Sequence, residues 1–136
     1  MTLVAGLGFR AGGDAASLRN ALQAALDAAS TAHGQPITLA NLSAFATAAD
    51  KAHHPALLQL AAELQLPIHF IPLPALADQP SAAPSAHVPE RYGAHSVAEA
   101  AALAAAGPSA TLLGRRSISP DRMATAALAF TENTSP

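Results

Sequence analysis

The sequence contains no cysteine and no tryptophan, and its aromatic residues are one tyrosine and four phenylalanines. The absence of cysteine excludes disulfide bonds, thiolate catalysis and cysteine-ligated metal centres. The scarcity of aromatic rings excludes a run of stacking platforms for single-stranded nucleic acid. Because only 12% of the residues are charged and the formal net charge is −2, we also expect no nucleic-acid partner.

The chain also lacks a hydrophobic run long enough to span a membrane, because prolines, glycines, histidines or charges interrupt every apolar stretch. No basic region precedes the first apolar residues, as it would in a signal peptide. We therefore expect a cytoplasmic protein with no membrane partner. The 136 residues, 51% of them hydrophobic, suffice for a single domain spanning 1–136 with a substantial core.

The most informative stretch is LVAGLGFRAGGD, residues 3–14. Its first three residues predict a buried strand, and its glycines predict a turn before a helix that Asp14 caps. Gly6 and Gly8 favour either a positive φ or the close approach of another backbone. Since helix N-termini attract anions and Arg10 can hold a carboxylate with two hydrogen bonds, we interpret the turn as an anion-binding loop. The alternative, a tight turn with a solvated Arg10, stays open.

Alternating helices and strands are predicted after this turn. We expect helices over 15–30 and 55–65 and strands over 43–47 and 66–72, with a helical turn at 38–42 and another at 75–78. The proline-rich segment 72–95 predicts a long loop, which acts either as a lid or as a passive connection.

The last third of the chain predicts a helix that ends at Ala106 and two strands, over 110–115 and 123–130. The connection between these strands is too short for a crossover helix, so they should pair antiparallel. The predicted fold class is therefore α/β. We expect a three-layer α/β/α sandwich with a mixed, mostly parallel sheet of about five strands that ends in this antiparallel pair.

Further candidate residues follow strand ends or begin a helix. Asp50 and Lys51 come after the second strand, at the sheet edge that also holds Arg10, and are either a substrate-binding pair or two solvated charges. Ser96 and Glu99 form a capping box, SVAE, which is either a structural cap or part of the same cleft. Arg115 is a weaker candidate. If the predicted strand over 110–115 runs antiparallel to the first strand, its end lies at the opposite side of the sheet from Arg10.

Nothing in the pattern predicts a metal, a cofactor or an assigned catalytic residue. The six histidines lack the usual spacings of metal ligands, and no Gly-x-Ser-x-Gly elbow presents a nucleophile.

The ordered segments together resemble the CobE family, which also covers the C-terminal domain of CbiG in cobalamin (vitamin B12) biosynthesis. These segments are GLGFR at 6–10, AT at 46–47 with Lys51, LPI at 66–68, GAHSVAEAA at 93–101, LLGR at 112–115 and AALA at 126–129. The resemblance covers nearly the whole chain, and the length is similar to that of free-standing members. It implies a protein of the aerobic corrin-ring pathway that binds or processes a precorrin-type tetrapyrrole intermediate.

Such an intermediate carries a rim of carboxylates, which suits a cationic cleft. The predicted substrate-binding residues are Gly6, Gly8, Phe9, Arg10, Thr47, Asp50, Lys51, Ser96, Glu99 and Arg115. Three functions stay open: a binding or carrier protein, a lactone-opening or rearranging enzyme that uses Asp50, Lys51 or Ser96, and a non-catalytic partner of other pathway enzymes. A homodimer is a further open alternative. The absence of cysteine, of a triad and of a metal motif favours the first function.

Overall fold

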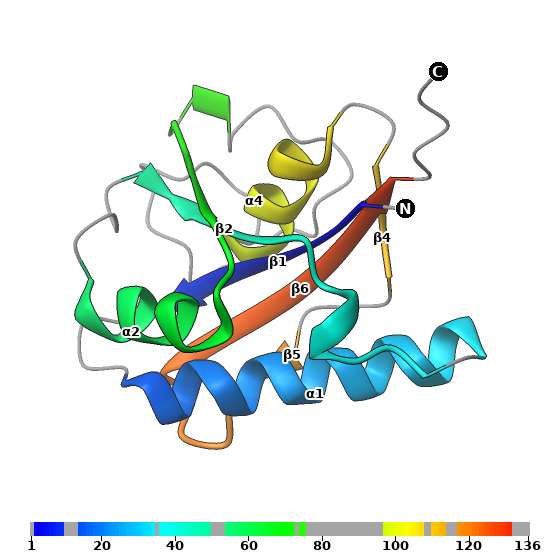
Figure 1. Ribbon diagram of the computed structural model, residues 1–136, viewed down its shortest axis with the longest axis horizontal. Coiled ribbons are helices and arrows are strands. Elements are labelled where there is room, and N and C mark those ends of the chain that lie inside the picture. The colour runs from blue at the N-terminus through cyan, green and yellow to red at the C-terminus, as the bar shows by residue number, and fades with distance from the viewer. Residues whose placement is uncertain are drawn as a thin grey trace.

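The computed structural model describes residues 2–9, 14–34, 36–49, 54–72, 74–75, 97–107, 110–113 and 117–131. Their strands form one six-stranded sheet in the order β3-β2-β1-β6-β4, with β5 also paired to β6 (Figure 1). The strands are β1 (Thr2–Phe9), β2 (Ala44–Ala48), β3 (Ile68–Ile71), β4 (Thr111–Leu112), β5 (Ser117–Ile118) and β6 (Ala124–Thr131). The helices are α1 (Ala15–His33), the 3-10 helix η1 (Leu39–Asn41), α2 (Pro55–Leu64) and α4 (Val97–Ala106).

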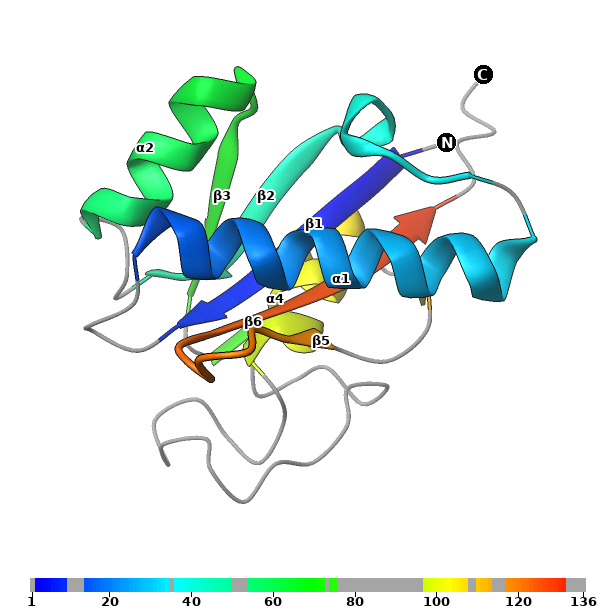
Figure 2. The ribbon, with the colours of Figure 1, turned by 90° about the horizontal axis from the view of Figure 1, so that it is seen from below.

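The sheet lies between two helical layers. Helices α1 and α2 cover one face and α4 covers the other, as the view from below makes clear (Figure 2). Strands β1, β2 and β3 run parallel to one another, whereas β6 runs antiparallel to β1, β4 and β5. The predicted α/β class, with a mixed sheet and a closing antiparallel strand pair, is thereby confirmed.

The edge strand beside β6 differs from the prediction. A single strand over 110–115 was expected, but β4 ends at Leu112 and a second short strand, β5, follows in the segment predicted as a turn. Leu112 pairs with Ala129 and Ser117 with Ala126, so four residues separate the two short strands in the chain while only two separate their partners on β6. This excess interrupts the edge strand. Both short strands run antiparallel to β6 and hence parallel to β1. The reason for ranking Arg115 as a weaker candidate, a strand antiparallel to the first one, therefore does not apply. Arg115 itself lies outside the described residues.

Strand β1 is longer than predicted, because it continues through Gly6 and Gly8 to Phe9. We expected the strand to give way to a turn at these glycines. Instead, β6 pairs with all eight residues of β1, and β2 pairs with Val4, Ala5 and Gly6 on the other side. Hydrogen bonds along these two ladders keep the glycines extended. Of the two roles considered for Gly6, close approach of another backbone is therefore the one found.

Helix α4 is the element that approaches Gly6. A β-carbon on Gly6 would lie 1.9 Å from the carbonyl oxygen of Ala98 and 2.7 Å from the backbone nitrogen of Ala102. Seven of the ten residues of α4 are alanine, and the sheet presents Ala46, Ala48 and Ala129 on this face. Small side chains on both surfaces thus let the helix lie very close to the sheet.

The opposite face carries the larger side chains. The fully buried Leu7, Leu22, Phe45 and Leu57 belong to the cluster between the sheet and helices α1 and α2. Asp14 caps α1 as predicted, accepting a hydrogen bond of 2.9 Å from the backbone nitrogen of Ser17. The helix runs three residues beyond the predicted Ser30, because Gly34 ends it with a left-handed φ of 75°.

The remaining helices agree closely with expectation. Helix α2 begins at Pro55, η1 occupies the predicted helical turn, and α4 ends at Ala106 before Gly107. Of the proline-rich segment 72–95, the structure describes only Pro72, Pro74 and Ala75. The predicted loop, whether a lid or a passive connection, therefore lies almost entirely outside the described residues. Most of the helical turn predicted at 75–78 lies outside them as well. Among the described residues, no helix is both long and apolar enough to cross a membrane.

Candidate functional site

The parallel strands end together at one edge of the sheet, which we call the carboxyl edge. Strand β1 ends there at Phe9 and β2 at Ala48, and α2 begins beside them at Pro55. Helix α4 starts on the other face, with the carbonyl oxygen of Ala98 above Gly6. Ligands of open α/β sheets bind outside the carboxyl ends of the strands, so this edge is the natural place to look for a site.

Five of the ten predicted site residues are described, and they lie at or near this edge: Gly6, Gly8, Phe9, Thr47 and Glu99. The other five lie outside the described residues: Arg10, Asp50, Lys51, Ser96 and Arg115. Arg10 directly follows Phe9, and Asp50 and Lys51 directly follow Ala49, so their nearest described neighbours belong to the carboxyl edge. Gly6 itself is buried beneath α4, which gives it a packing role.

Thr47 has a structural role that its sequence position does not reveal. The side chain is 0% exposed, and its Oγ1 donates a hydrogen bond of 2.7 Å to the carbonyl oxygen of Leu7. The paired residues of β1 and β2 end at Gly6 and Ala46, so this hydroxyl extends the connection between the two strands by one residue. Thr47 therefore ties the two strands together just before the carboxyl edge.

Replacing Thr47 with valine should lower the free energy of unfolding by about 1–2 kcal/mol, because the buried Leu7 carbonyl loses its donor while the side-chain volume is kept. Urea denaturation measures the change. Thr31→Val is the matched control, since that hydroxyl bonds Asp27 O on the exposed surface of α1; it should change stability by less than about 0.5 kcal/mol. Equal effects of the two substitutions would contradict the role of Thr47.

Glu99 lies in the first turn of α4, where an acidic side chain interacts favourably with the helix dipole. Only 3% of its surface is exposed. The capping box predicted its position in the helix, but a buried carboxyl group could not be inferred from the SVAE pattern.

His54 is a residue of this edge that was missed as a candidate. It occupies the N-cap position of α2, but its side chain makes no capping hydrogen bond. The imidazole instead meets the ring of Phe9 in an edge-to-face contact, with centroids 4.4 Å apart and an interplanar angle of 61°. Its Nδ1 atom is buried. The spacing of the histidines excluded the usual metal-ligand patterns but did not predict this contact, because a ring contact between residues this far apart leaves no local signal.

A second group of polar residues joins the start of α1 to the turn between β5 and β6. Asp121 accepts hydrogen bonds from Ser119 Oγ at 2.5 Å, from Ser17 Oγ and from the backbone nitrogen of Met123 at 3.1 Å. This turn leads into Ala124, which pairs with Phe9, so it too lies near the carboxyl edge. The hydrogen bonds from Ser119 and Ser17, followed by that from Met123, hold the pKa of Asp121 below its ordinary value.

A lowered pKa means that the ionised Asp121 stabilises the folded state. This contribution is fully present above the pKa of the unfolded chain and is lost as the pH falls through the lower pKa of the folded state. Asp121→Asn should therefore lower the melting temperature at neutral pH and reduce its dependence on pH below about pH 5. Thermal melts between neutral and acidic pH measure this, with Asp27→Asn on the surface of α1 as control. A variant whose acid profile matches that of the wild type would contradict the assignment.

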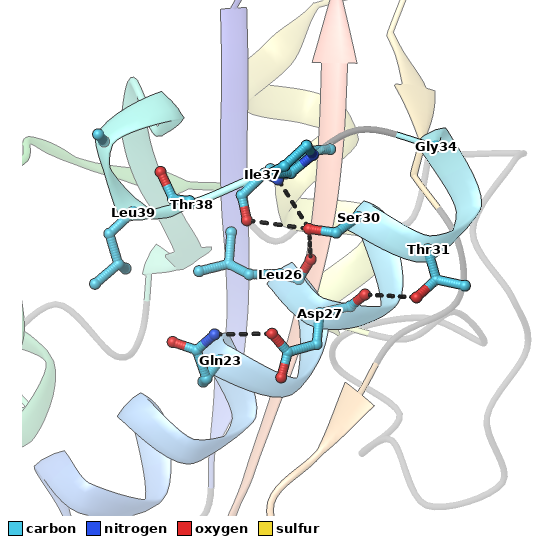
Figure 3. A pocket seen from close by; sticks show the side chains of 11 residues that line it. Gln23, Leu26, Asp27, Ser30, Thr31, Gly34, Ile37, Thr38 and Leu39 are labelled. Carbon is cyan, nitrogen blue, oxygen red and sulfur yellow. Dashed lines mark hydrogen bonds between the residues drawn. The ribbon is translucent and has the colours of Figure 1, made fainter.

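The structure also contains an open groove on the side of the molecule where β2 begins, opposite the carboxyl edge (Figure 3). It has a volume of about 780 Å³ and lies between the last turns of α1 and the segment that leads into η1. Ser30 fixes this segment, since its Oγ donates to the carbonyl oxygen of Ile37 at 3.2 Å and accepts from the backbone nitrogen of Ile37 at 2.8 Å. Among the described residues of its lining, Asp27 is the only charged one, and it is an anion.

Comparisons with known proteins agree with this architecture. The family model described as "Cobalamin synthesis G C-terminus" matches residues 3–129. A crystal structure of CobE, a protein from the cobalamin (vitamin B12) biosynthetic pathway, is similar with a TM-score of 0.77 and 39% identity, covering 96% of this chain and 91% of that chain. The cobalamin biosynthesis protein chiG from Agrobacterium tumefaciens is similar with a TM-score of 0.65 and 34% identity, covering 97% and 100%.

A third structure, of a cobalamin biosynthesis protein G homolog from Sulfolobus solfataricus, supports the fold alone. It has a TM-score of 0.69 and 18% identity, covering 97% of this chain and 37% of that longer chain. A search of curated proteins gives no match. Because the family model matches nearly the whole chain and CobE is 39% identical over more than 90% of both chains, the protein belongs to the Cobalamin synthesis G C-terminus family of cobalamin biosynthesis proteins.

Proposed function

We propose that this protein binds a precorrin-type tetrapyrrole intermediate of the aerobic corrin-ring pathway at the carboxyl edge and carries it between enzymes. Membership in a family of cobalamin biosynthesis proteins supports the pathway. The observation that carries the proposed site is the meeting of the carboxyl ends of the paired strands β1 and β2 with the start of α4, whose Ala98 carbonyl lies over Gly6. These three elements meet at the edge where open α/β sheets bind ligands.

The negative charge of a precorrin favours binding at the carboxyl edge over binding in the groove. A precorrin is a flat macrocycle with carboxylates around its rim, and it needs cationic or hydrogen-bond-donating partners. The chain supplies Arg10 directly after Phe9 and Lys51 shortly after Ala49. The charged group that the described part of the groove presents is the carboxylate of Asp27, which would repel such a ligand.

Of the predicted site residues that the structure describes, Thr47 is the one with a hydroxyl group. Thr47 carries a hydroxyl close to the proposed site, but it is buried and donates to the Leu7 carbonyl, so it is unsuited to attack a substrate. The enzymatic alternative, a lactone-opening or rearranging activity, would depend on Asp50, Lys51 or Ser96.

Optical titration with hydrogenobyrinic acid tests the proposal. We expect a saturable change in the corrinoid spectrum that is unaltered in Leu39→Asp, a groove variant whose side chain is 38% exposed. No spectral change with about 1 mM pigment would contradict binding. Mass spectrometry and chromatography of the pigment recovered after binding separate the two activities: an unchanged mass and retention time support a carrier, whereas hydrolytic lactone opening adds the mass of water and a rearrangement changes the retention time at constant mass.

A further inference from the structure

We infer that Arg122, in the turn between β5 and β6, is a further cation of the carboxyl edge and binds a rim carboxylate of the tetrapyrrole. This inference rests on the proposed function and extends the site to the side of β1 that faces away from β2. It depends on the position of the turn, the hydrogen bonds that hold it, and the backbone and side chain of Arg122.

The turn lies where β1 ends, as Figure 2 shows. Strand β6 starts at Ala124, which pairs with Phe9, the last residue of β1. Arg122 precedes Ala124 by two residues, and Arg10 follows Phe9 by one. The two arginines are therefore attached in the chain to one pair of neighbouring strand ends at the carboxyl edge.

Hydrogen bonds fix the shape of the turn. The backbone nitrogen of Arg122 donates to the carbonyl oxygen of Ser119 at 2.9 Å, and the backbone nitrogen of Ser119 donates to the carbonyl oxygen of Ala124 at 2.8 Å. The carboxylate of Asp121 accepts from Ser119 Oγ and from Ser17 Oγ on α1. The turn is thereby held both within itself and against α1. Such preorganisation lowers the entropic cost of a contact with a ligand.

The backbone of Arg122 is left-handed, with a φ of 61°. Glycine is the usual residue where a left-handed position precedes the second strand of a hairpin. An arginine there is strained, because its β-carbon crowds a carbonyl oxygen. Strained backbone is common where a side chain takes part in binding. Gln65 has a φ of 56° as well, but it ends helix α2, so the left-handed backbone indicates a site only together with the position and the charge of Arg122.

The side chain of Arg122 is accessible to a ligand. It is exposed, and within the part of the chain that the structure describes it forms no hydrogen bond or ion pair. Arg19, the other arginine that the structure describes, is by contrast paired with Glu63. The neighbouring carboxylate of Asp121 accepts its hydrogen bonds from two serine hydroxyls and the backbone nitrogen of Met123. The guanidinium group of Arg122 is thus left for a partner from outside the described residues.

The chemistry of guanidinium matches the proposed ligand. Its planar fork can donate two parallel hydrogen bonds to one carboxylate. A precorrin-type intermediate has several carboxylates around its rim, so Arg10 and Arg122 can each bind a different one. Two separate cations would orient the macrocycle as well as hold it.

Titration of Arg122 variants with hydrogenobyrinic acid tests the inference. Arg122→Gly removes the cation and should weaken binding by about 5- to 20-fold. The melting temperature should change little, because glycine accepts the left-handed backbone without strain. Arg122→Lys keeps the charge but not the planar fork, and should weaken binding by about two- to fivefold. Wild-type affinity in Arg122→Gly would overturn the inference.

Gln65→Gly and Arg19→Ala are the matched controls. The first introduces glycine at a left-handed position at the far end of α2, and the second removes an arginine that is paired with Glu63. Pigment affinity should stay within about twofold of the wild type in both. A loss in Arg19→Ala equal to that in Arg122→Gly would indicate an effect of overall charge and would also overturn the inference. A wild-type protein that binds no pigment would instead contradict the proposed function, so the two failures are distinguishable.

Discussion

Gly6→Ala is expected to lower the free energy of unfolding by about 3 kcal/mol, corresponding to a fall in melting temperature of about 10 °C. The added methyl group would lie 1.9 Å from the carbonyl oxygen of Ala98 and 2.7 Å from the backbone nitrogen of Ala102. Both atoms are helix backbone, so no side-chain rotation can relieve the overlap. Either α4 moves away from the sheet or β1 distorts, and both responses open the packed layer of alanines.

Gly34→Ala is the matched control for this prediction. Gly34 has a φ of 75° but nothing within 4 Å of its hypothetical β-carbon, so only the left-handed backbone should resist the substitution. A cost of about 1 kcal/mol is expected. Thermal and urea denaturation of both variants separate steric overlap from backbone strain. If Gly6→Ala proved as mild as Gly34→Ala, the close approach of α4 would be contradicted.

Arg10→Ala should weaken the binding of hydrogenobyrinic acid by about 1–3 kcal/mol, or about 5- to 150-fold. The guanidinium group is expected to hold a rim carboxylate through charge-assisted, bidentate hydrogen bonds, which are stronger than neutral ones. Raising the salt concentration should weaken binding by the wild type more than by the variant, because it screens the charge that the variant lacks.

Arg19→Ala provides the control for charge. Arg19 forms an ion pair with Glu63 between α1 and α2, and both side chains are substantially exposed. Its removal makes the net charge of the protein more negative by one, as Arg10→Ala does, but pigment affinity should stay within about twofold. Equal losses in the two variants would indicate a general electrostatic effect and would remove Arg10 from the proposed site.

The sequence predicted the fold where local patterns were strong. Asp14 at the start of α1, Pro55 at the start of α2 and Gly107 after α4 gave the helix boundaries to within a few residues. It failed at β5, because a two-residue strand is too short to show alternation. It also ended β1 too early, since a glycine inside a strand resembles a glycine in a turn until the approaching helix is known.

The candidate site was predictable only in part. The order of strands and helices predicted that Phe9 and Thr47 would lie near one edge. It could not predict that the Thr47 hydroxyl bonds Leu7, or that Ser17 bonds Asp121 from 104 residues away in the chain. The ring contact of His54 with Phe9 likewise joins residues that lie far apart in the chain. These interactions depend on register and packing, which no short sequence window contains.

The pairing of β1 with β6 also has a consequence for the order of events during synthesis. Thr2 pairs with Thr131, so the middle of the sheet joins the first and the last of the described strands, and β1 is synthesised long before its partner. Until residues 124–131 leave the ribosome, the nascent β1 has an open edge where its longest ladder should be. The domain therefore completes its central ladder only after release of the last strand, and a nascent chain in this state is a natural client for chaperones.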